Sequence, residues 1–308
     1  MNSSHNPAHL VGVGLCALDH LCLVEKFPGP DQKIEAIEFS LQGGGPVPTA
    51  LCAFSKLGGK SSFIGKCGND YQGQTVRSEL DKFGVCTRSM IYDKNCRTPN
   101  AFIWVDSRSG DRTVVLDRSD ISDLTADELD ENLISSCDYL LLDGREEKAA
   151  LKSAQIARNS GAEVILDAGS PRKNIEQLFP LIDHLVVSKT FVQRYMHEHD
   201  PLLGVRILAR RGFKSVVITL GDKGCACAAK DDIFTQPAFR VKSLDTTGAG
   251  DVFHGAYIFG LSQGWQSRKI VEFASAAASL KCRHLGGRKG IAAHAEIDKF
   301  LSEQLPAA

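Results

Sequence analysis

Short apolar runs alternate with helix-periodic stretches through the middle of the chain. Their spacing predicts strands at residues 139–142, 164–166, 185–187 and 215–219. It predicts helices between and after them, at residues 147–160, 175–178, 190–198 and 203–211. Continuous apolar strands separated by helices are typical of a parallel sheet that is covered by helices on both faces. Two longer helices rich in small residues, at 248–262 and 267–281, are expected to pack against that sheet.

Two segments do not follow this alternation. The first has strand-like residues at 20–24 and 34–39, separated by a PGPD turn. The second has strands at 100–105 and 113–116, joined by the polar SRSGDR turn. Both are half polar, as strands with one solvated face should be. We therefore expect a small antiparallel sheet, built from residues 16–42 and 98–118, that projects from the main sheet as a lid.

The composition narrows the class of protein. The chain has 308 residues, of which 43% are hydrophobic and 24% charged, and a formal net charge of −1. This balance is typical of a soluble globular protein and argues against nucleic-acid and membrane-surface partners, because both favour a basic excess. No apolar run approaches the ~20 residues of a bilayer span, and the polar start MNSSHNPAH is unlike a signal peptide. We expect a cytoplasmic protein with a single domain over residues 1–308.

The ten cysteines include no CxxC pair. Zinc sites show clustered pairs, and disulfide scaffolds are shorter chains than this one. We therefore expect reduced and mostly buried thiols, and we leave a redox role for one of them open.

The segment DTTGAGD at residues 245–251 carries the strongest chemical signal. Small residues followed by an apolar-periodic run place it at a helix N-terminus. Unpaired N–H groups and the helix dipole favour an anion there, and glycine lets a phosphate approach the backbone closely. A carboxylate beside a bound phosphate, here Asp251, can accept the proton of an attacking hydroxyl. The simpler alternative is a capped helix in which Asp251 only complements the dipole.

Two further glycine-containing segments are candidate ligand sites. Residues 43–50, GGGPVPTA, open a helix, and a ligand could rest on their backbone amides. Residues 219–224, TLGDKG, follow a buried strand at the sheet edge where open α/β sheets bind ligands. The alternatives are a flexible turn for the first segment and a plain hairpin into CACAA for the second.

Together these segments resemble the PfkB, or ribokinase-like, family of carbohydrate kinases. Residues 43–73 are similar to the N-terminal signature of the family, DTTGAGDVFHGA to its C-terminal signature, and TLGDKG to its nucleotide-binding turn. The resemblance spans nearly the whole chain. Within the family the chain looks most like the ketohexokinase and sulfofructose kinase branch, through stretches such as GDRTVVL, VVSKTF and SLKCRHLGGRKGI.

The resemblance implies a ribokinase-like α/β fold, with a nucleotide-binding core and a discontinuous β-sheet lid. It implies ATP- and Mg²⁺-dependent transfer of the γ-phosphoryl group to a sugar hydroxyl, on a ketose or an acidic sugar derivative. Asp251 would be the catalytic base, with the backbone of Gly248, Ala249 and Gly250 as the anion hole.

The resemblance also implies the binding residues. For the sugar these are Asp19, Gly43, Gly44 and Gly45, together with Asp251. For ATP they are Arg112, Ser188, Thr219, Gly221, Asp222, Lys223 and Gly224, together with Gly248 and Gly250. Some members of the family bind a monovalent cation, K⁺, at the positions of Asp245, Thr247, Gly286 and Gly290.

Three positions depart from the family pattern. The stretch SKTF at residues 188–191 stands where many members have Asn-x-x-Glu, in a form that the ketohexokinase branch shares. Pro48 replaces a sugar-binding asparagine, and Gly45 replaces a second polar residue. Because polar contacts dominate discrimination between sugars, plain ribose or fructose specificity is in doubt.

Arg145, which follows the strand at 139–142, could compensate for these losses. A guanidinium at that sheet edge can clamp an anionic group through two parallel hydrogen bonds. We therefore hypothesise a sugar that carries a phosphate, sulfonate or carboxylate. The alternative is that Arg145 pairs with Asp143, Glu146 or Glu147 on the surface.

Other interpretations explain fewer residues. A non-catalytic sugar or nucleotide sensor on the same fold would have lost the base or the anion hole, and both are present. Kinases of ribose, of phosphosugars and of nucleosides stay open, although no aromatic residue flanks the glycine run to stack on a base. Residues 11–14 resemble a dinucleotide fingerprint only faintly, because Ala17 stands at its third glycine. We expect His254 to pack within its helix. Because lid strands in this family often pair between subunits, the resemblance also implies a homodimer through the lid.

Overall fold

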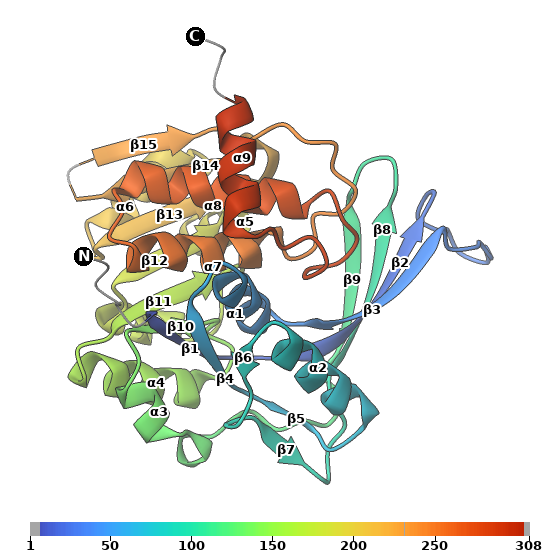
Figure 1. Cartoon of the computed structure of the whole chain (residues 1–308), viewed down its shortest axis with the longest axis horizontal. Coiled ribbons are helices and arrows are strands. Elements are labelled where there is room, and N and C mark those ends of the chain that lie inside the picture. The colour runs from blue at the N-terminus through green and yellow to red at the C-terminus, as the bar shows by residue number, and fades with distance from the viewer. Residues whose placement is uncertain (1–6, 231, 305–308) are drawn as a thin grey trace.

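A nine-stranded sheet forms the centre of the computed structural model, which describes residues 7–230 and 232–304. Its strands lie in the order β15-β14-β13-β12-β11-β10-β1-β4-β6 (Figure 1). Their bounds are β1 His9–Val13, β4 Lys60–Ile64, β6 Val85–Cys86, β10 Tyr139–Leu142, β11 Glu163–Ala168, β12 His184–Ser188, β13 Ser215–Thr219, β14 Cys225–Ala229 and β15 Asp232–Gln236. Neighbours from β6 to β13 run parallel, and β14 and β15 pair antiparallel at one edge. The predicted mainly parallel sheet is confirmed.

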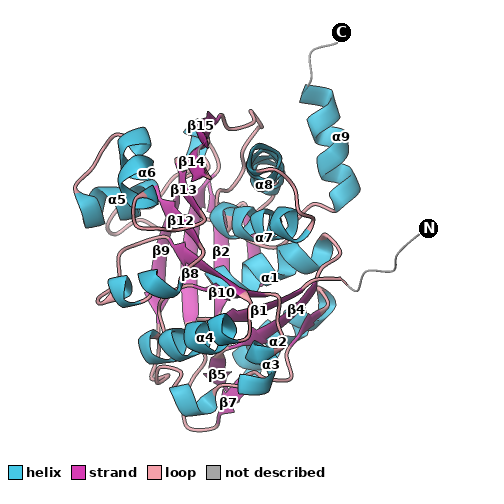
Figure 2. Ribbon diagram, turned by 90° about the vertical axis from the view of Figure 1, so that its left-hand side faces the viewer, coloured by secondary structure: helices cyan, strands magenta, loops and turns pink. Residues whose placement is uncertain are grey.

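Helices cover both faces of this sheet (Figure 2). The helices are α1 Pro46–Lys56, α2 Tyr71–Lys82, α3 Glu131–Ser135, α4 Glu147–Asn159, α5 Lys189–Met196, α6 Pro201–Ala209, α7 Ala249–Ser262, α8 Ser267–Lys281 and α9 His294–Gln304. One buried cluster joins the sheet to α1, α7 and α8, and a second joins it to α4, α5 and α6. Consecutive strand residues alternate between the clusters, as Leu10 and Val11 do. This burial on both faces explains why the strands are continuous apolar runs.

A second sheet projects beside the main one (Figure 1). It has the strand order β3-β2-β8-β9, with β2 Ala17–Val24, β3 Glu38–Gly44, β8 Asn100–Asp106 and β9 Arg112–Asp117. As predicted, it comes from two separate stretches of chain. It is not wholly antiparallel, because β2 and β8, which join the two hairpins, run parallel to each other. A small parallel pair, β5 Lys66–Gly68 with β7 Ile91–Asp93, lies apart from both sheets.

The strand predicted at 34–39 is largely wrong. β3 begins only at Glu38, which pairs with Leu23 near the end of β2. Ile37 still donates a 2.7 Å hydrogen bond to the carbonyl of Leu23, but its side chain is 60% exposed, and residues 32–36 form no strand. At its other end β3 continues to Gly44, opposite Ala17.

The glycine run therefore forms the end of strand β3 as well as the turn into helix α1. Gly43 and Gly44 pair with β2, and Gly45 makes the turn with a positive φ of 102°. Pro46 then begins α1, where its fixed φ suits a first helical residue. The segment is thus held by strand pairing and is not a flexible turn.

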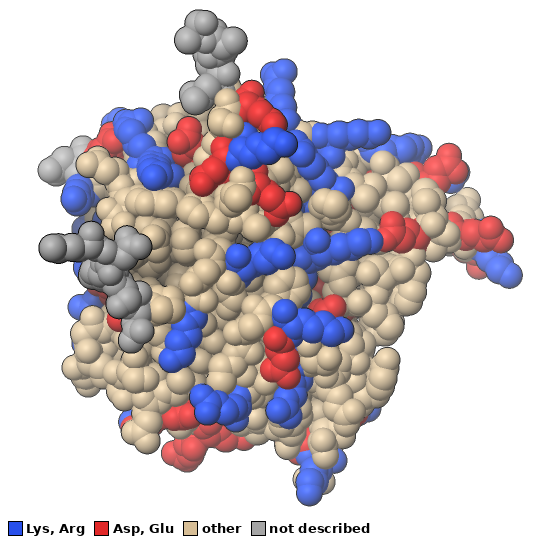
Figure 3. Space-filling view, in the orientation of Figure 1, with Lys and Arg blue, Asp and Glu red and all other residues tan. Residues whose placement is uncertain are grey.

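Basic and acidic side chains are interspersed on the face shown in Figure 3. Among the helices that the structure describes, none is long and apolar enough to cross a membrane. All ten cysteines are free thiols. Within residues 7–230 and 232–304, no group of three or more His, Cys, Asp or Glu side chains is placed to hold a metal ion.

Candidate active site

The N-terminus of α7 offers room for an anion. Gly248 caps the helix with φ 73°, and a Cβ there would lie 2.6 Å from the Cα of Gly287. A side chain at Gly248 would therefore be both strained and too close to backbone. A Cβ at Gly250 would meet no atom within 4 Å, so the first turn faces open space at that position. A phosphate can approach the N–H groups of such a turn closely.

Asp251, in the first turn of α7, lies among charged neighbours. Burial and the nearby carboxylate of Asp167 raise its pKa, whereas His254, Arg112 and Lys281 act in the opposite direction. A carboxyl whose pKa is raised toward neutrality suits a general base better than one with an ordinary pKa.

Asp167, at the end of β11, is a site residue that the sequence interpretation missed. Its Oδ2 lies 3.5 Å from Nδ1 of His254, which donates a 2.7 Å hydrogen bond to the carbonyl oxygen of Gly250. His254 is 5% exposed and packs within its helix, as expected. An acidic residue directly after the buried run at 164–166 was the signal that could have found Asp167.

Asp19 on β2 faces the glycine strand β3. A Cβ on Gly44 would overlap the Asp19 carboxylate, and a Cβ on Gly43 would overlap the guanidinium of Arg288. Gly45 packs on the carbonyl of Leu15 instead. Burial raises the pKa of Asp19 to about 7; Arg288 acts to lower it, and Asp251 acts to raise it. Asp19 and Asp251 are therefore near enough for their charges to interact.

Arg112 connects the second sheet to the start of α7. Its Nη1 donates a 2.7 Å hydrogen bond to Oγ1 of Thr246, which in turn donates to the carbonyl oxygen of Gly110 at 3.3 Å. The structure thus brings Arg112 to the DTTGAGD segment from far away in the sequence.

The TLGDKG segment is a hairpin between β13 and β14, at the carboxyl end of β13. Gly221, Asp222 and Lys223 form an exposed 3-10 turn, and Gly224 packs against the carbonyl of Gln236 with φ 87°. Thr219 lies in register with Ser188 on the neighbouring strand. The Ser188 hydroxyl caps α5 by accepting from the N–H of Phe191 and donates to the carbonyl of Gly169. The predicted alternative, a hairpin into CACAA, is therefore confirmed, and it lies at the sheet edge where open α/β sheets bind ligands.

Asp245 and its neighbours form a closely bonded loop. The two oxygens of its carboxylate accept hydrogen bonds from the N–H groups of Thr247 at 2.8 Å and Gly286 at 2.7 Å. The fully buried Lys281 donates a 2.8 Å hydrogen bond to the Asp245 carbonyl. Gly290 packs against the carbonyl of Lys281. The structure thus gathers all four residues that the family resemblance connects with K⁺.

Arg145 is partly buried at the carboxyl end of β10. Its Nε forms a long ion pair with Oδ2 of Asp143 at 4.0 Å, so the Asp143 pairing weighed as the alternative is present, although the Asp143 side chain is buried and does not lie on the surface. Arg172 lies close by, and its pKa is lowered by burial and by the charge of Arg145. The two arginines are therefore near enough for their charges to interact.

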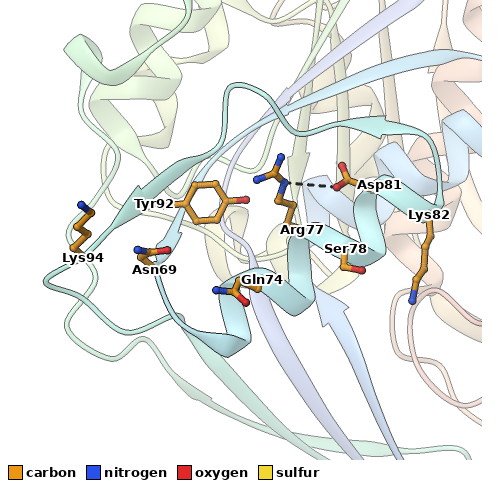
Figure 4. A pocket seen from close by; sticks show the side chains of 8 residues that line it. All are labelled: Asn69, Gln74, Arg77, Ser78, Asp81, Lys82, Tyr92 and Lys94. Atoms are coloured by element: carbon orange, nitrogen blue, oxygen red, sulfur yellow. Dashed lines mark ion pairs between the residues drawn. The ribbon is translucent and has the colours of Figure 1, made fainter.

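A hollow of about 720 Å³ lies elsewhere, on the outer side of α2 (Figure 4). It is lined by Asn69, Gln74, Arg77, Ser78, Asp81, Lys82, Tyr92 and Lys94. None of the residues predicted for the site lines it. Glu79 of the same helix instead contacts Gly43 and Arg288 in the active site.

Comparisons with known proteins identify the family of this chain. Residues 7–293 match the model of the pfkB family carbohydrate kinases. A ribokinase of Haemophilus influenzae is 26% identical over 95% of this chain and 98% of its own length. Fructokinase-1 of Zea mays is 30% identical over 85% of this chain and 88% of its own.

The fold of the chain is also similar to that of a ribokinase of known structure. The structure of Arabidopsis thaliana ribokinase complexed with ribose and ATP superimposes with a TM-score of 0.83 at 24% identity, covering 98% of this chain and 100% of that one. The ribokinase-like α/β fold is therefore confirmed. With the match over residues 7–293, the chain belongs to the pfkB family of carbohydrate kinases.

Proposed function

We propose that this kinase transfers the γ-phosphoryl group of ATP to a hydroxyl of a ketose or an acidic sugar derivative. The observation that carries the proposal is the convergence at the start of α7. The open first turn at Gly250, the carboxyl of Asp251 and the guanidinium of Arg112, held by Thr246, lie at one place. Phosphoryl transfer needs a base for the hydroxyl and positive or N–H groups for the phosphates, and these residues supply both.

Each group has one task in this mechanism. Asp19 accepts hydrogen bonds from the sugar hydroxyls, beside the backbone of Gly43 and Gly44. Asp251 accepts the proton of the attacking hydroxyl. The amides of residues 248–250 and the guanidinium of Arg112 stabilise the charge that spreads over the transferring group. The turn at residues 221–224, with Thr219 and Ser188 at the adjoining strand ends, would hold the nucleoside part of ATP.

The family resemblance implies two metal ions, and the residues of the site fit Mg²⁺ better than K⁺. Mg²⁺ takes oxygen ligands and usually binds through a few carboxylates and the substrate phosphates. Asp251 and Asp167 offer such carboxylates at the edge where the phosphates would lie, and Mg²⁺ would neutralise phosphate charge there. K⁺ fits less well, because both oxygens of Asp245 already accept N–H bonds and the ammonium of Lys281 already brings a positive charge. No step of the proposed mechanism uses K⁺.

The acidic group of the substrate would lie against Arg145 and Arg172. Support comes from the position of Arg145, which is partly buried at the sheet edge and whose guanidinium makes only a long 4.0 Å ion pair with Asp143. Its charge also acts on Asp167, which in turn acts on Asp251. An anionic substituent would relieve the repulsion between the two guanidiniums and form charge-assisted hydrogen bonds.

The activity is tested by ADP release from Mg-ATP over a panel of neutral ketoses, aldoses, anionic sugars and nucleosides. We expect turnover with a sugar, and none when the same panel is run with Asp251→Asn. Silence across the panel, with ATP still bound in calorimetry, would contradict the proposal and favour a sensor. A nucleoside as the best substrate would contradict the assignment of a sugar.

Arg145→Ala should separate acidic from neutral substrates. Losing a charge-assisted hydrogen bond costs about 1.5–3 kcal/mol, so KM for an anionic sugar should rise roughly 10- to 100-fold. KM for a neutral ketose should stay within about twofold. Arg268→Ala is the matched control, because it removes an exposed arginine that pairs with Asp232 on β15. Equal effects of Arg145→Ala on neutral and anionic sugars would refute the acidic-sugar hypothesis.

We also propose that the second sheet acts as a lid and as the interface of a homodimer. Support comes from apolar side chains on this sheet that the single chain leaves exposed: Phe39, Leu41, Phe102, Val114 and Val115. Exposed apolar patches mark interaction surfaces. A cytoplasmic location stays a prediction, in keeping with the free thiols.

A further inference from the structure

Arg288 lies in the loop between α8 and α9 and is buried against the glycine strand β3. The residue is only 2% exposed. Its Nη1 lies 3.2 Å from Oε2 of Glu79, and its Nη2 donates a 3.2 Å hydrogen bond to the carbonyl of Gly44. Among the described residues, its Nε has no hydrogen-bond partner. Burying an unpaired N–H is costly, so a guanidinium kept in this place calls for an explanation beyond packing.

Arg288 and Glu79 together hold the backbone of β3. The Glu79 carboxylate also accepts a hydrogen bond from the N–H of Gly43. The N–H of Arg288 donates to Oε1 of Gln42 at 3.2 Å, and the side-chain amide of Gln42 donates to the carbonyl of Leu285 at 3.0 Å. Gln42 is the residue of β3 that pairs with Asp19. The position of the glycine strand relative to Asp19 therefore depends on this loop.

The same loop reaches the start of α7. The N–H of Gly286 donates to Oδ2 of Asp245 at 2.7 Å, and Gly287 packs directly against Gly248. Arg288 thus lies between the strand that would bind the sugar and the helix that would bind the phosphates.

Four charged side chains act on Asp19 from the elements packed around it. Arg288 comes from the α8–α9 loop, Glu79 from α2, Asp251 from α7 and Asp245 from the segment before α7. Burial and the three acidic groups raise the pKa of Asp19, and Arg288, the one cation among the four, lowers it. The charge of Asp19 matters because a carboxylate accepts hydrogen bonds from two hydroxyls, whereas a carboxylic acid must also donate.

We propose that Arg288 is a positioning residue for the substrate: it fixes the glycine strand and supplies the positive charge against which Asp19 presents a carboxylate. The inference rests on the proposed function, since it takes Asp19 as the sugar-binding carboxylate. Arg288 itself does not touch the sugar. It acts through the backbone of β3 and through the charge on Asp19.

Three variants test this role. The pair Arg288→Met with Glu79→Gln removes both charges, so that no carboxylate is left buried without its partner. Arg288→Lys keeps the positive charge but loses the planar guanidinium, whose N–H groups form a fork of donors. Lys289→Met is the matched control, because the neighbouring residue makes an exposed ion pair with Glu38. Sugar KM, ATP KM and kcat are measured from pH 6 to 9, on the sugar that the wild type prefers.

Arg288 acts on Asp19 more strongly than Glu79 does, so the double variant should still raise the pKa of Asp19. A rise of about one unit would lower the ionised fraction at pH 7 and raise sugar KM roughly fivefold. The KM should recover toward pH 9, where Asp19 is ionised again, while kcat and ATP KM change little. Arg288→Lys should keep the pH dependence of the wild type, and Lys289→Met should change nothing. A sugar KM that rises equally at all pH values, or that falls together with kcat, would reduce Arg288 to a structural role and overturn the proposal.

A second measurement needs no activity. The carboxyl carbon of Asp19 is titrated by NMR in the ligand-free protein, with Asp19→Asn assigning the signal. We expect a higher midpoint in the double variant and the wild-type midpoint in Lys289→Met. Unchanged midpoints together with sugar turnover by the wild type would overturn the inference alone. Shifted midpoints with no turnover of any sugar would overturn the proposed function alone. If the double variant does not fold, the midpoint in Arg288→Lys decides: it should stay near the wild-type value, because the positive charge is kept, and a midpoint raised by about one unit would overturn the inference.

Discussion

Asp251→Asn is expected to lower kcat by about three orders of magnitude, since a positioned general base contributes roughly 10²- to 10⁴-fold. The amide has the shape of the carboxyl but cannot take the proton of the attacking hydroxyl. ATP should bind as well as before or slightly better, because one negative charge near the phosphates is gone. The measurements are ADP release under saturating sugar and ATP, and calorimetric titration of ATP.

The variant should fold at least as well as the wild type. Burial and the repulsion from Asp167 raise the pKa of Asp251, so the folded protein resists its charged form, and an uncharged amide relieves that cost. Asp167→Asn is the comparison variant, measured at saturating Mg²⁺ because Asp167 would also help to hold that ion. Removing its charge takes away repulsion and lowers the pKa of Asp251, so the acid limb of the kcat–pH profile should move to lower pH. At pH 8, kcat should stay within about tenfold. Turnover of Asp251→Asn near the wild-type level would show that another group takes the proton.

The sequence predicts the main sheet well because each of its strands carries its own signal. A strand buried on both faces is a continuous apolar run, as at 215–219, and the helix that follows has its own period. The second sheet is harder to predict, because its half-polar strands have little signal of their own. Pairing with β2 places β3 at Glu38–Gly44, four residues later than the prediction, and the pairing partner is not visible in the local pattern.

The candidate site likewise contains residues that the sequence predicts and residues that it does not. Asp251, Gly248 and Gly250 belong to one contiguous segment whose residue types carry the chemistry, and the sequence alone predicts their roles. Glu79 and Arg288 lie 209 residues apart in the chain, and nothing in their local sequence marks them. Only the fold brings α2 and the α8–α9 loop to the same side of Gly43. Residues that position others through long-range contacts are therefore beyond what sequence patterns predict.

The second large effect is expected from Gly248→Ala. The backbone there has φ 73°, which costs a non-glycine residue about 1 kcal/mol. The added Cβ would lie 2.6 Å from the Cα of Gly287, and a backbone atom cannot rotate away. Either the first turn of α7 or the loop that carries Arg288 must shift. Because a displacement of about 1 Å in a reacting geometry costs roughly 100-fold, we expect kcat/KM for ATP to fall by about that factor.

Gly264→Ala is the control that separates two effects of Gly248→Ala: backbone strain, which lowers Tm, and displacement of the phosphate-binding turn, which lowers activity. Gly264 also has a positive φ, 65°, but a Cβ there would meet no atom within 4 Å, and the residue follows the far end of α7. Both variants should therefore lose Tm through backbone strain, and only Gly248→Ala should lose activity per folded molecule. If the two variants have equal kcat/KM, the close contact between Gly248 and Gly287 does not set the geometry of the anion hole. If Gly248→Ala alone is impaired, that contact holds the phosphate-binding turn in place, and the loop behind it becomes part of the catalytic geometry.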